Sequence, residues 1–341
     1  MKLFHSLLYP LLGGLFCLSC SDDEQDSGTK QPTTAGEVTF GVDLTGFSTR
    51  VTQDGSSWND GDKIGTYVLD MKTLEPVTEA ANVPYVCSEE GASVSFTSTT
   101  PLKVQNDGTP VKFVAYYPYN ADVRNFNYPV QLAAQERGST ACDLLYAATK
   151  EEYTYSPENE PHISLNFTHR LAKVILKFVN MEKEPLEVSD VRIEGMQTAA
   201  SFNIQTDVLT VDESSVATIN PYHNATTGFY EAIILPSALT DSYKVSFVLD
   251  DREKEWIFTN LDIALPQFHK GYSYTFALYI DDSGFVEMGR LENVEGGNSS
   301  APWEDGSSED GTAEGDKTPV SGYAFTPADG TQQALADTEL K

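Results

Sequence analysis

Short runs of alternating apolar and polar residues fill most of the first half of this 341-residue chain. β-Branched and aromatic side chains recur at every second position, which is typical of strands with one buried face. Asp-Gly and Asn-Asp-Gly sequences separate the runs, and these residues favour tight turns. The pattern predicts strands over residues 38–42, 64–69, 83–87, 93–96 and 111–117.

A second series of alternating runs starts near Leu165. Because no amphipathic helical period interrupts the two series, they indicate an all-β fold of antiparallel sandwiches. Two stretches stay open: 144–148 is a strand or a helical turn, and 153–161 is a domain junction or a long loop. The second series predicts strands over residues 171–179, 186–193, 200–204, 208–211, 229–235, 243–249, 256–258 and 272–280.

The first residues follow a different pattern. Lys2 precedes an apolar run that ends at Leu18, which is shorter than the roughly 20 apolar residues that span a bilayer. Residues 1–19 are therefore predicted to be a secretory signal peptide. Ser19 directly before Cys20 resembles a bacterial lipobox, in which Cys20 becomes the acylated first residue of the mature chain. An ordinary signal peptide with an incidental cysteine, or an uncleaved anchor, is the alternative.

Charge and composition limit the remaining possibilities. The chain has 51 acidic and 22 basic residues, a formal net charge of -29, which repels phosphate backbones and disfavours nucleic-acid binding. Residues 20–36, which begin with an acidic run, are predicted to be a lipidated flexible tether, and 306–341 an acidic, largely disordered tail. Between them we expect an N-terminal sandwich over 37–164 and a C-terminal sandwich over 165–305.

Two cysteines, Cys87 and Cys142, lie beyond the signal and the lipobox. An exported compartment permits a disulfide between them, but one pair without repeated spacing is weak evidence for a bridge. Two separate buried thiols are at least as consistent with the sequence. Since no Cys-x-x-Cys or paired histidines accompany them, we predict neither a metal site nor a cofactor.

The sequence offers no persuasive catalytic constellation. It lacks a Gly-x-Ser-x-Gly elbow and a glycine-rich phosphate loop. Residues 54–62 (DGSSWNDGD) partly resemble a calcium loop but lack its final glutamate, and turn residues between strands explain them more simply. His169-Arg170 precedes a strand, where we expect a surface or junction role. The chain is therefore not predicted to be an enzyme.

Six short segments follow one another in a recognisable order: residues 49–52 (TRVT), 58–65 (WNDGDKIG), 113–119 (FVAYYPY), 143–147 (DLLYA), 165–174 (LNFTHRLAKV) and 301–303 (APW). Together they resemble the fimbrillin-like proteins of the Bacteroides group, the subunits of lipoprotein-derived pili. The acidic run after Cys20 is similar to the surface-export signal of Bacteroides-type lipoproteins. The resemblance implies two tandem transthyretin-like antiparallel β-sandwich domains.

The resemblance also implies a mechanism of assembly by strand exchange. A trypsin-like protease cuts after an arginine near the end of the first strand region, and another subunit's terminal strand fills the groove. Arg50 is the best-placed basic residue because none lies between Lys30 and Arg50, although an ordinary exposed strand arginine is an equal alternative. The strand lost would be 38–42, and the donor either 285–288 with Leu291 and Val294, or 318–341.

The implied location is the cell outer membrane and the fimbrium, and the implied partners are other pilus subunits and, through a lipid anchor, the membrane itself. Whether the chain is a stalk, tip or anchor subunit is left open. The alternative function is a surface lipoprotein that binds glycans or host ligands without polymerising. A hydrolase would need clustered carboxylates in a cleft. Aromatic residues that sugars could stack on, or that simply pack in the core, are Tyr116, Tyr117, Tyr119, Tyr222 and Tyr230.

Overall fold

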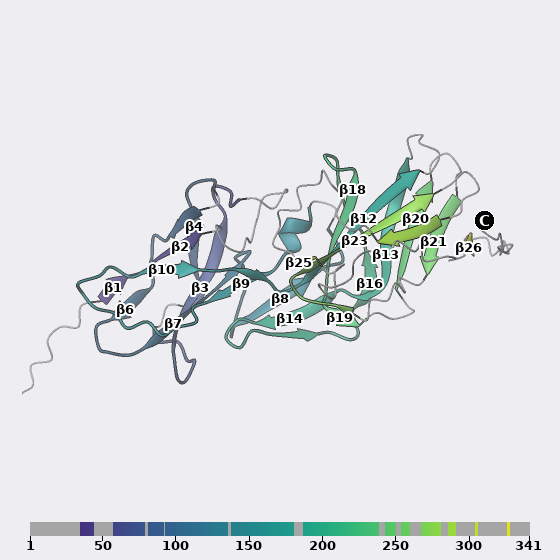
Figure 1. Cartoon of the computed structure of the whole chain (residues 1–341). Helices are drawn as coiled ribbons and strands as arrows, with labels where there is room; N and C mark the ends of the chain where they lie inside the picture. Colours follow the sequence, from purple (N-terminus) through teal and green to yellow (C-terminus); the bar gives the residue numbers. More distant parts are fainter. Residues whose placement is uncertain are drawn as a thin grey trace, which may run out of the picture. The chain divides into compact units, whose positions relative to one another are not determined.

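The computed structural model describes residues 35–43, 57–78, 81–91, 93–135, 138–180, 187–238, 243–249, 254–259, 267–280, 286–290, 304–305 and 326–327. Apart from the 3-10 helix η1 (Ser139–Cys142), the regular elements of these residues are strands (Figure 1), which confirms the all-β prediction. Among these residues no helix has the length and apolarity to cross a membrane. The predicted signal peptide, Cys20 and Arg50 lie outside the described residues.

The N-terminal part is built on one eight-stranded sheet in the order β10-β2-β5-β4-β3-β7-β9-β11. Its strand pairs are antiparallel, except that β10 and β2 run in parallel. Beside it, β1 (Ala35–Glu37) pairs with β6 (Lys103–Gln105). The strands of the large sheet are β2 (Thr39–Asp43), β3 (Lys63–Asp70), β4 (Val83–Cys87), β5 (Ser93–Thr97), β7 (Val111–Tyr117), β9 (Leu145–Ala148), β10 (His162–Leu165) and β11 (Thr168–His169).

The connection between β10 and β11 shows how this sheet encloses its core. The two strands form its opposite edges, yet only Asn166 and Phe167 separate them in the sequence. Because a residue spans at most about 3.6 Å, the sheet curls until its edges approach each other. Trp58 lies inside, with its ring edge-on to Phe96 and Phe167, so the sheet wraps around an aromatic core.

The C-terminal part is a sandwich of two sheets. One has the order β17-β18-β12-β23-β24, with β25 also on β23, and the other β16-β13-β20-β21-β26. Buried residues of both sheets, such as Val174 of β12 and Phe247 of β20, form one hydrophobic core. The strands are β12 (Ala172–Asn180), β13 (Val188–Gln197), β16 (Val216–Ile219), β17 (Tyr222–Asn224), β18 (Phe229–Ile234), β20 (Lys244–Leu249), β21 (Lys254–Thr259), β23 (Tyr272–Ile280), β24 (Val286–Arg290), β25 (Glu304–Asp305) and β26 (Thr326–Pro327); β19 (Ser237–Ala238) pairs with β22 (Gln267–Phe268).

A further sheet, of three strands, joins the two parts. In it β8 (Asn127–Gln131) pairs with β14 (Ala199–Asn203), which pairs with β15 (Val208–Val211). One hydrophobic cluster combines Val114 and Tyr146 from the N-terminal part with Phe202 and Ile233 from the C-terminal part. The two parts therefore share a packed interface, which we call the junction.

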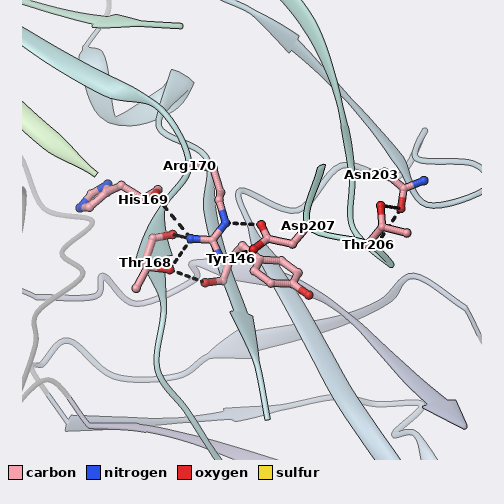
Figure 2. Close-up of polar contacts among 7 residues, drawn as sticks. All are labelled: Tyr146, Thr168, His169, Arg170, Asn203, Thr206 and Asp207. Carbon is pink, nitrogen blue, oxygen red and sulfur yellow. Dashed lines mark hydrogen bonds and ion pairs between the residues drawn. The ribbon is translucent and has the colours of Figure 1, made fainter. Parts of the chain in front are cut away.

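Polar side chains make specific bonds across the junction. The buried Gln135 side chain donates to the Ile233 carbonyl (2.6 Å) and accepts from the Ile233 N–H (2.7 Å). The guanidinium of Arg170 makes two contacts with the carboxylate of Asp207, Nε–Oδ1 at 2.5 Å and Nη2–Oδ2 at 3.1 Å. Figure 2 shows the two side chains facing each other. Its Cζ lies 4.7 Å from the ring centroid of Tyr146. These contacts give the His169-Arg170 motif the junction role expected for it.

The large sheet decides between the alternatives for both stretches that the sequence left open. Residues 145–148 form the strand β9 rather than a helical turn. Residues 153–161 connect β9 to β10 within the same sheet, and Tyr153 pairs with Val111 on the way. This stretch is therefore a long loop inside the N-terminal part.

Candidate functional site

The strand β2 lies inside the large sheet rather than at its edge. Residues 39–42 of β2 pair with β10, and residues 40–43 pair with β5 on the other side (Figure 1). Between β1 and β2, the N–H of Val38 donates to the carbonyl of Leu102 at 2.9 Å. We call the position that residues 35–43 fill, with β10 on one side and β5 and β6 on the other, the β2 slot.

Three side chains of this segment complete the core of the sheet. Val38, Phe40 and Val42 are each at most 2% exposed. The Phe40 ring lies edge-on to Tyr85, at 4.8 Å between centroids, and to Phe113, at 5.8 Å. Burying a side chain of this size contributes about 1.5–3 kcal/mol, against a typical domain stability of about 5–15 kcal/mol. Withdrawal of the segment would therefore leave an apolar groove with unpaired backbone on both sides.

A tyrosine of β4 fixes the segment where β1 leads into β2. The Tyr85 hydroxyl donates to the carbonyl of Val38 at 2.9 Å and accepts from the N–H of Leu102 at 2.8 Å. Burial raises the pKa of Tyr85 to about 12, and the nearby Glu37 carboxylate adds to the rise, while the hydrogen bond from Leu102 opposes it. Tyr85 therefore holds the segment as a neutral phenol.

Two glycines of the segment lie directly under side chains of the receiving sheet. A Cβ on Gly36 would be 2.4 Å from Cε2 of Tyr155, and a Cβ on Gly41 would be 2.7 Å from Nε2 of His162. The Thr39 hydroxyl and Nδ1 of His162 lie 3.0 Å apart, within hydrogen-bonding distance. A side chain at position 36 would have to displace the buried ring of Tyr155, whereas one at position 41 would displace the exposed ring of His162 at less cost. The slot therefore favours glycine at both positions, and most strongly at position 36.

Charge contributes little to holding the segment. Glu37 and Lys103 form an ion pair at 3.2 Å, but both side chains are more than half exposed, and such pairs contribute about 0–1 kcal/mol. Apolar burial and backbone pairing therefore hold the segment in the β2 slot. Both are interactions that another strand of suitable pattern can reproduce.

All partner strands of residues 35–43 come after the predicted cut in the sequence. β2 ends at Asp43, and the next described residue is Ser57. Arg50 lies between them, outside the described residues, and β5, β6 and β10 all follow it in the sequence. A cut after Arg50 would leave residues 35–43 bound to the fold only by non-covalent contacts.

Both segments predicted as donors contain strands at sheet edges of the C-terminal part. Val286–Arg290 forms β24 on β23, and Thr326–Pro327 forms β26 on β21. In the described part of the chain, each of these two strands has a single partner strand. Phe285, Leu291 and Val294 lie outside the described residues.

The two cysteines occupy different clusters. Cys87 is buried in the core of the large sheet, whereas Cys142 packs at the junction cluster, and both are free thiols. Burial raises the pKa of both thiols above the usual range. The structure thus has two separate thiols, of which Cys87 is buried and Cys142 is partly buried.

Other residues singled out in the sequence make contacts that serve the fold. Tyr116 is fully buried, and its hydroxyl donates to Oδ1 of Asn82 at 2.6 Å. The half-buried Tyr230 donates to the carbonyl of Val188 at 2.6 Å. In the described end of the calcium-like loop, the carboxylate of Asp62 accepts from the N–H of Asn59 at 2.7 Å, which is a turn contact. Among the described residues no group of three or more His, Cys, Asp or Glu could hold a metal ion.

Sequence reasoning identified the segment 38–42 but not the residues that shape its slot. Tyr85 lies in β4, Tyr155 in the loop before β10 and His162 in β10, all distant in sequence from residues 35–43. Nothing in their local sequence sets them apart. The glycines at 36 and 41 are a usable signal, because glycine weakens a strand interior and often marks close approach of a neighbour.

A model of the fimbrillin-like family matches residues 49–303. A provisionally assigned cell adhesion protein from Bacteroides uniformis is 23% identical, with a TM-score of 0.62 over 76% of this chain and 96% of that chain. A similarly assigned protein from Bacteroides ovatus is 16% identical, with a TM-score of 0.59 over 77% of this chain and 99% of that chain. No curated protein matches the chain significantly.

At these identities the two solved structures support the fold alone. The family model carries more weight, since it spans well over half of the sequence and covers all six segments on which the resemblance was based. The chain belongs to the fimbrillin-like family.

Proposed function

We propose that this chain is a structural or accessory subunit of a surface pilus, exported as a lipoprotein and assembled by protease-triggered β-strand exchange. Its family supports a pilus or adhesin-like surface protein and a structural role rather than catalysis. The observation that carries the finer proposal is the β2 slot. A terminal strand that buries Val38, Phe40 and Val42 is separated from all its partner strands by a segment containing Arg50.

The physical logic of exchange follows from the contacts in the slot. Without residues 35–43, the facing edges of β10 and β5 lose their backbone partners. Exposed strand edges beside an apolar groove recruit another strand, because main-chain hydrogen bonds supply affinity and side-chain pockets supply specificity. Cleavage at Arg50 thus converts a closed subunit into one that accepts a strand.

The lipid anchor is part of the same proposal and rests on the sequence around Cys20. Acylation there would hold the subunit at the outer membrane until cleavage at Arg50 releases it, or permanently in an anchor subunit. Metabolic labelling with a palmitate analogue should mark the wild-type chain in cells. Cys20→Ala should lose the label, whereas Cys142→Ala, which leaves the lipobox intact, should keep it.

Limited proteolysis tests the exchange. Purified chain lacking the signal peptide is treated with a trypsin-like protease, and the products are followed by mass spectrometry and size-exclusion chromatography. We expect one early cut after Arg50, followed by polymers whose yield rises with protein concentration. Arg50→Gln should be resistant to this cut and remain monomeric under the same treatment.

The decisive measurement is the oligomeric state of cut chain from which residues 35–50 have been removed. If that chain is folded and still monomeric at high concentration, polymerisation through the β2 slot is wrong. The alternative, a surface lipoprotein that binds ligands as a monomer, would then be preferred.

A further inference from the structure

The β2 slot imposes a pattern that can be sought elsewhere in the sequence. Glycine is favoured at positions 36 and 41, where Tyr155 and His162 cover the strand. Large apolar residues fill the inward positions between them, Val38 and Phe40. A strand that fits in the same register therefore reads Gly-x-apolar-x-apolar-Gly.

One other segment of the chain has this pattern. The 24 glycines include four pairs that are five positions apart: 36/41, 41/46, 284/289 and 306/311. Only the first and third of these have apolar residues at both inward positions. Residues 284–289 read Gly-Phe-Val-Glu-Met-Gly, against Gly-Glu-Val-Thr-Phe-Gly at 36–41.

We infer that the β2 slot, once emptied, accepts the segment Gly284–Arg290 of a second copy of this chain, with Gly284 in the place of Gly36 and Gly289 in the place of Gly41. This assignment rests on the proposed strand exchange and adds to it the identity of the donor and its register. It also makes the subunit self-complementary, because slot and donor belong to the same chain.

The position of this segment in the fold is consistent with a donor role. Residues 286–290 form the edge strand β24, which pairs with β23 over five positions. In the slot, the corresponding backbone is paired on both sides, with β10 at residues 39–42 and with β5 at residues 40–43. Transfer from β23 to the slot therefore increases the number of strands that hold the segment from one to two.

The other predicted donor, residues 318–341, fits the slot less well. Its glycines, Gly322 and Gly330, are eight positions apart, so no register places both under the covering rings. Pro327 lies in its β26 strand and has no N–H to donate to a neighbouring strand.

One position of the assigned donor departs from β2. Arg290 falls in the place of the buried Val42, at the end of the slot. A long side chain there can lay its aliphatic stem along the groove and carry its charge past the strand end. Arg290→Val restores the β2 residue and should therefore strengthen the exchange.

The first test compares polymer yield among chains cut after Arg50. The double variant Gly284→Val/Gly289→Val should lower the yield about tenfold or more, because the added side chains overpack the slot. The matched control Gly296→Val/Gly297→Val, outside the pattern, should leave it unchanged, and Arg290→Val should raise it. If wild-type chain polymerises and the double variant does so equally well, the donor assignment is wrong.

The register is tested by cross-linking. In the assigned register Glu287 takes the place of Thr39, whose Cα partner in β10 is His162. Glu287→Cys and His162→Cys, placed on separate copies and mixed after cleavage, should be joined by a short thiol cross-linker. Efficient joining of Val286→Cys or Met288→Cys with His162→Cys in its place would overturn the register.

A synthetic peptide separates this inference from the proposed function. A peptide of residues 283–292 should bind cut chain freed of its first strand, and the same peptide with valine at positions 284 and 289 should bind at least about tenfold more weakly. If the wild-type peptide binds but no polymers form, the slot and its ligand are right and pilus assembly is wrong. If polymers form but neither peptide competes with them, the donor lies elsewhere.

Discussion

The β2 slot and the junction both hold together segments that are far apart in the sequence, but they do so with different chemistry. In the slot, Val38, Phe40 and Val42 insert between two strands, and the polar contacts are mostly made by backbone. Across the junction, the side chain of Gln135 bonds to Ile233 and that of Arg170 pairs with Asp207.

The difference shows which contact can be exchanged. Backbone pairing and apolar filling accept any strand of suitable pattern. The junction bonds instead depend on particular side chains in a fixed geometry: Gln135 against the backbone of Ile233, and Arg170 against Asp207. We therefore expect the slot to release and accept strands while the junction stays closed. This difference between the slot and the junction can be tested by mutation.

The largest effect should come from Phe40→Ala in the uncut chain. Truncating a fully buried phenylalanine costs about 3–5 kcal/mol, so the free energy of unfolding in urea should fall by that amount. Glu37→Ala, in the same segment but with an exposed side chain, should change it by less than about 1 kcal/mol. Equal losses of unfolding free energy in the two variants would contradict a slot held by the burial of Phe40.

Gln135→Ala should have the next largest effect and should act at the junction. It leaves the buried N–H and carbonyl of Ile233 without the partners that Gln135 provides, at about 1–3 kcal/mol for each group. We expect urea denaturation to show a loss of about 3 kcal/mol in cut and uncut chain alike. A loss confined to uncut chain would mean that junction and slot are coupled.

The regular strands of this fold can be predicted from the sequence because the side chains on each of their faces have consistent surroundings. Residues 83–87, 111–117, 208–211 and 272–280 form strands within the bounds that alternation predicts. The strand β8 is not predicted from the sequence, because it contains Pro129 and only its Val130 is buried. It is a strand because β14 provides a partner, which local sequence does not reveal.

The candidate site is predictable to a similar extent. Alternation identifies residues 38–42 as a strand, but its neighbour β10 lies more than a hundred residues away and was expected to be loop or the beginning of a second series. Likewise, the sequence around Gln135 and Asp207 does not mark them as junction residues. Their partners, Ile233 and Arg170, are distant in sequence and become neighbours only in the folded chain.

Gly36→Ala tests the steric requirement of the slot. The added Cβ would lie 2.4 Å from Cε2 of Tyr155, so we expect the uncut chain to lose about 1–3 kcal/mol of stability from overpacking. Gly91→Ala is the matched control, because a Cβ there meets its nearest neighbour, Cγ1 of Val94, at an ordinary 3.4 Å. Equal stabilities of the two variants in thermal or urea denaturation would show that Tyr155 moves aside without cost.

The smallest effect concerns alkaline pH and Tyr85. Its pKa is about 12 in the folded chain and about 10 when unfolded, so the folded state keeps the phenolic proton longer. The resulting stability is complete below about pH 10 and is lost as the pH rises toward 12, since the unfolded chain releases its proton first. Tyr85→Phe should therefore weaken the alkaline fall in unfolding free energy measured in urea.

Tyr146→Phe allows the same measurement at the junction, for comparison with Tyr85→Phe in the slot. Burial also raises the pKa of Tyr146 to about 12, but its ring lies at the junction under Arg170. Both variants should flatten the alkaline fall, whereas only Tyr85→Phe, which loses the bond to the Val38 carbonyl, should speed release of the first strand from cut chain at neutral pH. Equal release rates, measured by size-exclusion chromatography, would mean that Tyr85 packs in the core without fastening the strand.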